Sequence, residues 1–254
     1  IIWAGPNPLT KLADLKPERY GIELAPGGNI LPAMAAYKNF PGMERAIYYY
    51  YDFPKNPVNA WLERWIQRRS ADARVHIARD WRELGGGDFL FLVSCHQIIS
   101  KAVRDTFRHA LVLHASALPK GRGMSPHVWQ ILEGADRITL TLLNAEDALD
   151  SGAIWRQVEL RFDGTELHDE INRVLFDAEI KLMDWALDHC DRTRPIAQIG
   201  EPTYYRRRTP TDSRIDPTRP LTESFDLLRI ADPDRYPAHF EYRGQKYVIR
   251  IEKA

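Results

Sequence analysis

The sequence predicts an α/β fold: a Rossmann-like open sheet with helices on its faces, followed by a small C-terminal α+β subdomain. Two uninterrupted apolar runs carry this prediction, FLFLV at 89–93 and ALVL at 110–113. Such runs are typical of central strands that are covered on both faces. Between 45 and 116 strand-like and helix-like segments alternate, which favours a doubly wound sheet.

The other elements follow from hydrophobic periodicity and from turn residues. Strands are expected at 45–53, 74–78, 137–143 and 153–162, and helices at 56–71, 96–107, 126–134, 166–190 and 222–232. The segment 239–253 predicts a hairpin that turns at Arg243 and Gly244. We interpret 1–44, which is rich in Pro and Gly, as an extension with one short helix at 31–39.

These elements divide the chain into three expected units. The extension at 1–44 precedes a catalytic domain at 45–195. A Pro-rich, basic linker then opens a small C-terminal subdomain at 196–254.

The composition excludes several classes of protein. Lys plus Arg and Asp plus Glu both number 35, so the chain has no overall positive charge that would attract nucleic acid. Cys95 and Cys190 form no CxxC pair, which favours a reducing cytoplasm, and no metal site is predicted. No apolar run reaches the roughly 20 residues of a membrane helix, and the N-terminal segment lacks the pattern of a signal peptide.

A candidate site lies where the predicted strands end. Ligands of open α/β sheets bind beyond the carboxyl ends of the strands, and His114 ends one apolar run there. Asp150 lies in a loop that follows another strand. An imidazole beside a carboxylate forms a general acid/base unit. The alternative is that His114 is a structural, hydrogen-bonded residue and Asp150 a turn former.

The segment from His114 to Trp155, HASALPKGRGMSPHVWQILEGADRITLTLLNAEDALDSGAIW, resembles the folate-dependent formyltransferases. That family carries an H-x-S motif, then L-P-x-x-R-G, and later D-x-G in a loop. The matching residues occur in order: His114, Ser116, Leu118, Pro119, Arg122, Gly123, Asp150 and Gly152. The similarity runs from about 45 to 196, and landmarks in the C-terminal tail also match.

The resemblance implies a sheet of the formyltransferase type and transfer of a formyl group from 10-formyltetrahydrofolate to an amine. His114 would be the general base or proton shuttle, and Asp150 would orient it. The residues implied to bind the folate are Ser94, His96, Gln97, Ile98, Ile99, Asn144 and Asp147. Those implied to bind the acceptor are Ser116, Lys120 and Arg122.

One position departs from the family. The family has Asn two residues before the catalytic His, and this chain has Val112. That Asn donates to the developing oxyanion, and loss of such a donor costs on the order of 10²–10³ in rate. Asn144, Gln97, a backbone N–H or protonated His114 could replace it, which is the reading we favour. A slow enzyme and a folate-binding protein without efficient transfer are the alternatives.

The expected acceptor is a small-molecule amine, an amino sugar that is nucleotide-linked. Zero net charge and a short C-terminal segment argue against nucleic acid as a partner. The cluster Arg206–Arg207–Arg208 would suit a diphosphate, although a solvated linker is the simpler interpretation. An N-hydroxylated ornithine and methionyl-tRNA remain as other acceptors. A formyl-folate hydrolase is the alternative activity, no membrane partner is expected, and a homodimer is one expected assembly.

Overall fold

The computed structural model describes residues 46–50, 57–70, 73–95 and 97–254. The extension at 1–44 and its expected helix lie outside the described residues. Within the described part of the chain, no helix has the length and apolar character that crossing a membrane requires.

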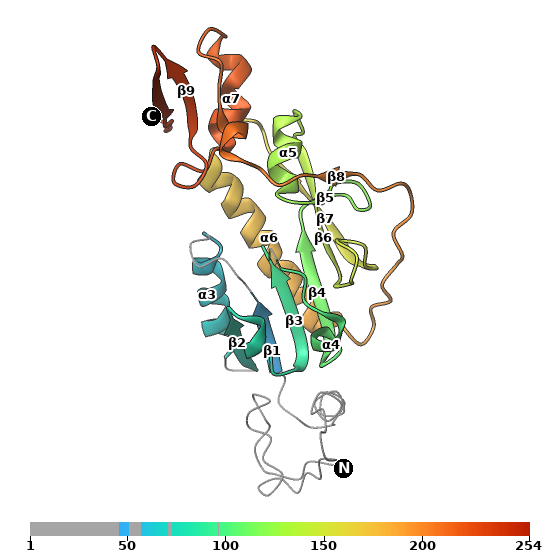
Figure 1. Cartoon of the computed structure of the whole chain (residues 1–254). Coiled ribbons are helices and arrows are strands. Elements are labelled where there is room, and N and C mark those ends of the chain that lie inside the picture. The colour runs from blue at the N-terminus through green and yellow to red at the C-terminus, as the bar shows by residue number, and fades with distance from the viewer. Residues whose placement is uncertain (1–45, 51–56, 71–72, 96) are drawn as a thin grey trace, which may run out of the picture.

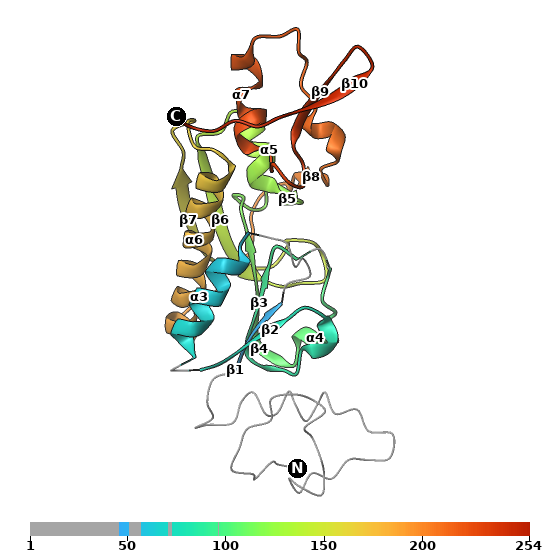
Figure 2. The same cartoon turned by 90° about the vertical axis from the view of Figure 1, so that its left-hand side faces the viewer.

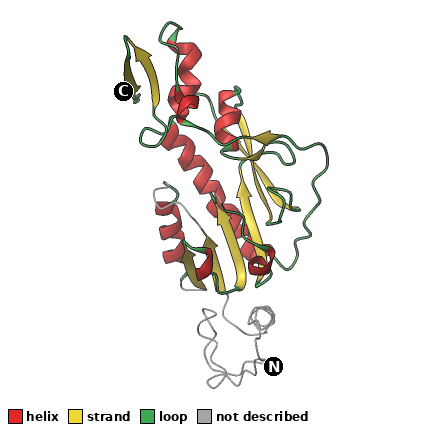
Figure 3. Ribbon diagram, in the orientation of Figure 1, coloured by secondary structure: helices red, strands yellow, loops and turns green. Residues whose placement is uncertain are grey.

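A six-stranded sheet forms the centre of the molecule (Figures 1 and 3). Its order is β2-β1-β3-β4-β6-β7, so the Rossmann-like open sheet is confirmed. The first four strands in this order are parallel, whereas β6 is antiparallel to both of its neighbours. The strands are β1 (Ala46–Tyr50), β2 (Arg74–Ala78), β3 (Gly87–Val93), β4 (Phe107–His114), β6 (Arg137–Asn144) and β7 (Ile154–Arg161).

Two helices cover one face of this sheet, α3 (Asn59–Arg69) and the long α6 (His168–His189), as Figure 2 shows. Their apolar stripes meet the inward-facing side chains of β3, β4 and β6 in the main core. The indole N–H of Trp61 donates to Asp177 at 2.7 Å and that of Trp65 to Asp184 at 2.6 Å. These bonds satisfy the polar ends of two large core side chains and fix α3 against α6.

Among the described residues, the opposite face carries the short helix α4 (Lys101–Arg104; Figure 2), and the 3-10 turn η2 (Trp81–Glu83) follows β2. The predicted helix at 96–107 is therefore largely wrong. Ser100 is extended (φ −60°, ψ 151°), so helical geometry begins only at Lys101. The segment before it remains a loop, which is available to line a cavity at the end of β3.

The linker is an ordered part of the fold. Its strand β8 (Tyr204–Tyr205) pairs in parallel with β5 (Arg122–Gly123), in the loop after β4. Further along the chain come η3 (Pro210–Ser213), α7 (Leu221–Ile230) and the hairpin β9 (Ala238–Tyr242) to β10 (Gln245–Ile249). The predicted hairpin is confirmed, with Arg243 and Gly244 between its strands and both at positive φ. Helix α5 (Pro126–Leu132) packs against α7.

Candidate active site

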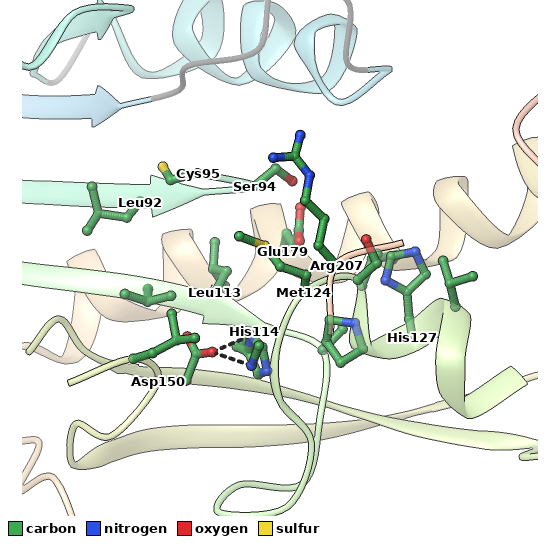
Figure 4. A pocket seen from close by; sticks show the side chains of 18 of the residues that line it. Leu92, Ser94, Cys95, Leu113, His114, Met124, His127, Asp150, Glu179 and Arg207 are labelled. Atoms are coloured by element: carbon green, nitrogen blue, oxygen red, sulfur yellow. Dashed lines mark hydrogen bonds and ion pairs between the residues drawn. The ribbon is translucent and has the colours of Figure 1, made fainter. Parts of the chain in front are cut away.

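A cavity of about 300 Å³ lies across the carboxyl ends of β3 and β4 (Figure 4). The ends of these strands, the N-terminal half of α6, and the linker with α7 and the segment after it all contribute to its lining. The sheet therefore places its ligand site at the edge that the fold class predicts.

His114 and Asp150 lie together in this cavity, as the sequence predicted. Nδ1 of His114 is 3.6 Å from Oδ2 of Asp150, and the side chains are only 7% and 8% exposed. Nε2 of His114 lies 2.8 Å from the carbonyl of Gly121. Because a carbonyl only accepts, Nε2 carries the proton, and Nδ1 is the nitrogen that can gain one beside the carboxylate.

Gly123 connects the loop after β4 to this pair. Its N–H donates to Oδ2 of Asp150 at 2.9 Å, while its φ is +105°. A Cβ at this position would lie 2.2 Å from the backbone oxygen of Tyr205. Glycine is therefore required by both the backbone conformation and the close approach of β8.

Asp150 reaches His114 by a route that strand order alone does not predict. Strand β6 runs antiparallel to β4, and Asn144 at its end pairs with Leu111, before His114 in β4. The loop after β6 therefore has to turn back along the sheet. Gly152 allows this turn, because a Cβ there would lie 2.0 Å from the carbonyl oxygen of Asn144.

Gln198 of the linker, which the sequence did not single out, holds that loop in place. Its Nε2 donates to the carbonyls of Asp150 at 2.8 Å and Gly152 at 2.9 Å. Its Oε1 accepts from Nη2 of Arg122 at 2.6 Å. The linker thus fixes the backbone on which the candidate catalytic carboxylate stands.

The loops expected to bind folate divide between the cavity and its surroundings. Ser94, Gln97, Ile98, Ile99 and Asn144 line the cavity, and Ser94 adopts a left-handed conformation with φ of 51°. His96 lies outside the described residues. Asp147 does not line the cavity, because its 72% exposed carboxylate pairs with Nη2 of Arg104 at 2.8 Å.

Arg104 is a residue that sequence reasoning missed. Its side chain is only 6% exposed, and Nη1 donates to the carbonyl of Ile99 while Nη2 holds Asp147. It therefore ties the loop after β3 to the loop after β6. Nothing in the sequence around Arg104 distinguishes it from a surface helix residue.

The strand register decides which side chains can assist His114. Val112 lies on the same face of β4 as His114 and lines the cavity. Asn144 pairs with Leu111, so its side chain lies on the opposite face. There its Oδ1 accepts from the indole N–H of Trp155 at 2.6 Å. The side chain of Asn144 therefore cannot replace the missing oxyanion donor at Val112.

The three residues expected to bind the acceptor lie away from the cavity. Arg122 is engaged by Gln198, Lys120 is exposed to solvent, and Ser116 is buried with no partner for its hydroxyl among the described residues. None of the three lines the cavity, so their assignment as acceptor contacts is not supported by the geometry. The L-P-x-x-R-G loop supports the site through its backbone and through Arg122.

The cavity is also lined by six polar residues that were not predicted from the sequence. They come from α5, α6 and the C-terminal segment: His127, His168, Asn172, Glu179, Asp232 and Arg235. His168, Asn172 and Glu179 follow one another at helical spacing on α6. Polar residues at this spacing along an otherwise apolar helix stripe were the sequence signal that could have indicated this part of the cavity.

Burial changes the charge of two of these groups. It lowers the pKa of His127 to about 4, with the positive charges of His168 and Arg208 adding to the effect. Burial also raises the pKa of Glu179 to about 8. Both side chains are therefore neutral near pH 7 in the free protein.

The linker arginines are not a uniformly solvated cluster. Arg206 pairs with Asp212, and Arg208 is buried, with Nη2 donating to Ser213 Oγ at 3.1 Å. Arg207 is exposed at the cavity and forms no ion pair with a described residue. Of these three arginines, Arg207 is therefore the exposed one that lines the cavity without an ion pair to a described residue.

An open α/β sheet with an imidazole–carboxylate pair in a cavity at its carboxyl edge is an arrangement suited to general acid/base chemistry on a bound ligand. Residues 52–187 match the formyl transferase family. The chain belongs to this family and is a folate-dependent formyltransferase.

Solved structures share the fold at low sequence identity. Methionyl-tRNA formyltransferase from Clostridium thermocellum superposes with a TM-score of 0.70 at 21% identity, over 84% of this chain and 94% of that one. A sugar N-formyltransferase from a Shewanella species gives 0.63 at 15% identity, over 83% and 98%. HypX from Aquifex aeolicus in complex with tetrahydrofolic acid gives 0.69 at 17% identity, over 82% of this chain and 37% of HypX.

Proposed function

We propose that the protein transfers the formyl group of 10-formyltetrahydrofolate to the primary amine of a nucleotide-linked amino sugar. The observation that carries this proposal is the cavity itself. It contains the His114–Asp150 pair on one wall and the unpaired charge of Arg207 on another.

His114 is proposed to accept the proton that the amine loses as its nitrogen attacks the formyl carbon. Nδ1 is the receiving atom, since Nε2 already donates to Gly121. Asp150 stabilises the resulting imidazolium through Oδ2. The C–N bond to the folate then breaks, and the imidazolium returns the proton to the departing nitrogen.

The folate is proposed to occupy the side of the cavity lined by Gln97, Ile98 and Ile99. This wall offers apolar side chains together with loop backbone, which suits a flat pterin ring. Arg104 keeps the wall in place by joining both loops. HypX, which shares the fold, was crystallised with tetrahydrofolic acid.

Arg207 is proposed to contact the diphosphate of the acceptor. A guanidinium with no carboxylate partner can form paired hydrogen bonds to phosphate oxygens. The balance of 35 basic and 35 acidic residues favours such a small acceptor over tRNA, whose binding depends on neutralising many phosphates.

The test is release of tetrahydrofolate from 10-formyltetrahydrofolate in the presence of a panel of amines. We expect nucleotide-linked amino sugars to accelerate the release of tetrahydrofolate strongly, and the same amino sugars without the nucleotide to accelerate it only weakly. Acceleration by methionyl-tRNA or by N-hydroxyornithine would identify another acceptor. Release that is independent of any amine would identify a hydrolase, and binding without turnover would indicate a folate-binding protein.

A further inference from the structure

Glu179 is a buried carboxylic acid, and no described residue provides a cation to balance its charge. It stands on α6 and is 5% exposed, and it lines the cavity that also contains His114 (Figure 4). No described residue donates a hydrogen bond to its Oε2. Burial without a partner costs free energy, so α6 would be more stable with an apolar side chain at this position.

The charged and titratable groups around the cavity do not compensate for it. They come from the loop after β3, α4, β4, the loop after β6, α5, α6, the linker and the segment after α7: Cys95, Arg104, His114, Glu146, Asp150, His127, His168, Arg207, Arg208, Asp232, Arg235 and Tyr236. Desolvation is the only cause that raises the pKa of Glu179, and none of these groups contributes. No described residue therefore places a cation at Glu179, and a bound ligand can supply one.

We propose that Glu179 binds the amino group of the acceptor as an ammonium ion inside the cavity. This inference rests on the proposed function, because it gives the amine its place in the same cavity. An ammonium group fits the site because it has three donors and no acceptor, and a carboxylate accepts at both oxygens.

The proton balance of this step is simple. The neutral acid of the free enzyme releases one proton to solvent when an ammonium ion binds, and an ion pair forms. Within that pair a proton can pass from nitrogen to the carboxylate oxygen. The N–H bond breaks, an O–H bond forms, and the amine regains the lone pair that it needs to attack the formyl carbon.

The first experiment measures the titration of Glu179 itself, in full-length protein with ¹³C-labelled glutamate. The Glu179→Gln variant identifies the carboxyl resonance. Titrations are compared with glucosamine and with glucose, which differ in the amine. We expect glucosamine to lower the titration midpoint of Glu179 and glucose to leave it unchanged. An unchanged midpoint with glucosamine overturns the proposal, whatever the amine panel shows.

The second experiment separates ligand binding from structural support. We expect Glu179→Gln and Glu179→Leu to raise the KM for the amine about 10- to 100-fold, the range of a hydrogen bond to a charged group, with the KM for the folate unchanged. Both variants should melt at or above the wild-type temperature. Glu201→Gln, an exposed change in the linker, is the matched control. An unchanged KM for the amine, or a fall in melting temperature with a proportional loss of kcat, contradicts the proposal.

The two proposals fail in different ways. If no amine in the panel is formylated but glucosamine still shifts the titration of Glu179, the acceptor assignment fails and the ammonium site stands. If an amino sugar is formylated with the same KM by Glu179→Gln, the function stands and the ammonium site fails.

Discussion

The backbone N–H of Gly123 donates a 2.9 Å hydrogen bond to Oδ2 of Asp150. The same oxygen faces Nδ1 of His114 at 3.6 Å. A loop that follows β4 and a loop that follows β6 are thus joined at the candidate catalytic carboxylate. The predictions below test what this arrangement contributes.

Asp150→Asn should lower kcat by about 10²–10⁴-fold, the contribution typical of a positioned acid/base unit. The amide keeps the shape of the side chain but removes the charge that stabilises the imidazolium of His114. Asp188→Asn is the control, since Asp188 is exposed on α6 and does not line the cavity. Equal activity of the two variants in the tetrahydrofolate-release assay would remove Asp150 from the mechanism.

Gly123→Ala should lower both kcat and the melting temperature. A Cβ would meet the Tyr205 backbone oxygen at 2.2 Å, so β5 and β8 must separate and Asp150 loses its donor. Gly134→Ala is a matched control, because Gly134 also has positive φ (88°) but nothing lies within 4 Å of its Cβ position. We expect the control to lose only the roughly 1 kcal/mol of a left-handed non-glycine residue and to keep its kcat.

Gln198→Ala should reduce kcat about 10-fold, as expected when one supporting hydrogen-bonded group worth roughly 1.4 kcal/mol is lost. Gln198→Glu separates the two roles of this side chain. It keeps an acceptor for Arg122 but cannot donate to the carbonyls of Asp150 and Gly152. We expect both variants to be equally slow in steady-state kinetics. Full activity of Gln198→Glu would mean that only the contact with Arg122 matters.

Val112→Asn should not raise kcat, because on the reading favoured here another donor already stabilises the oxyanion. The new amide would stand on the face of β4 that carries His114, and the side chain of Asn144 cannot take this role. The melting temperature should fall, because Val112 packs against the apolar cluster of Leu90, Leu92 and Phe107. A rise in kcat of about 10-fold or more would show instead that neither Gln97, a backbone N–H nor His114 fills the position.

His127 should make the protein less stable in acid. Its pKa is about 4 in the folded protein and 6.5 as an ordinary value, so the unfolded chain binds more protons between these pH values. Its contribution to stability is therefore present above pH 6.5 and is lost as the pH falls toward 4, by at most about 1.4 kcal/mol per pH unit. Denaturant unfolding of His127→Gln should show a shallower loss over this range. An identical slope would mean that His127 is not the group responsible.

Local patterns were sufficient for much of the fold and for choosing His114 and Asp150 as the candidate catalytic pair. Continuous apolar runs define β3 and β4 because strands covered on both faces have no polar side. The Arg243–Gly244 turn was predictable from Gly244, because the turn needs positive φ and glycine adopts it without steric cost. His114 and Asp150 were found through motif order, and they lie together in the cavity.

Other expectations failed where long-range contacts decide the structure. The segment 97–100 carries a helical pattern but remains a loop, and Arg104 anchors its end to Asp147 from the loop after β6. Arg122 has the charge to bind a ligand, yet Gln198 holds it outside the cavity. No local pattern encodes these partners, because they are distant in sequence.

The sequence by itself determined the class of fold, the strand that ends in His114 and the carboxylate that accompanies it. Only the tertiary structure decided which polar side chains share the cavity with this pair. The reason is physical. The polar residues His168, Asn172 and Glu179 can be recognised at helical spacing in the sequence. Their burial, however, depends on α5 and the C-terminal segment packing over this part of α6. That packing removes water from Glu179 and leaves its Oε2 with no hydrogen-bond donor among the described residues.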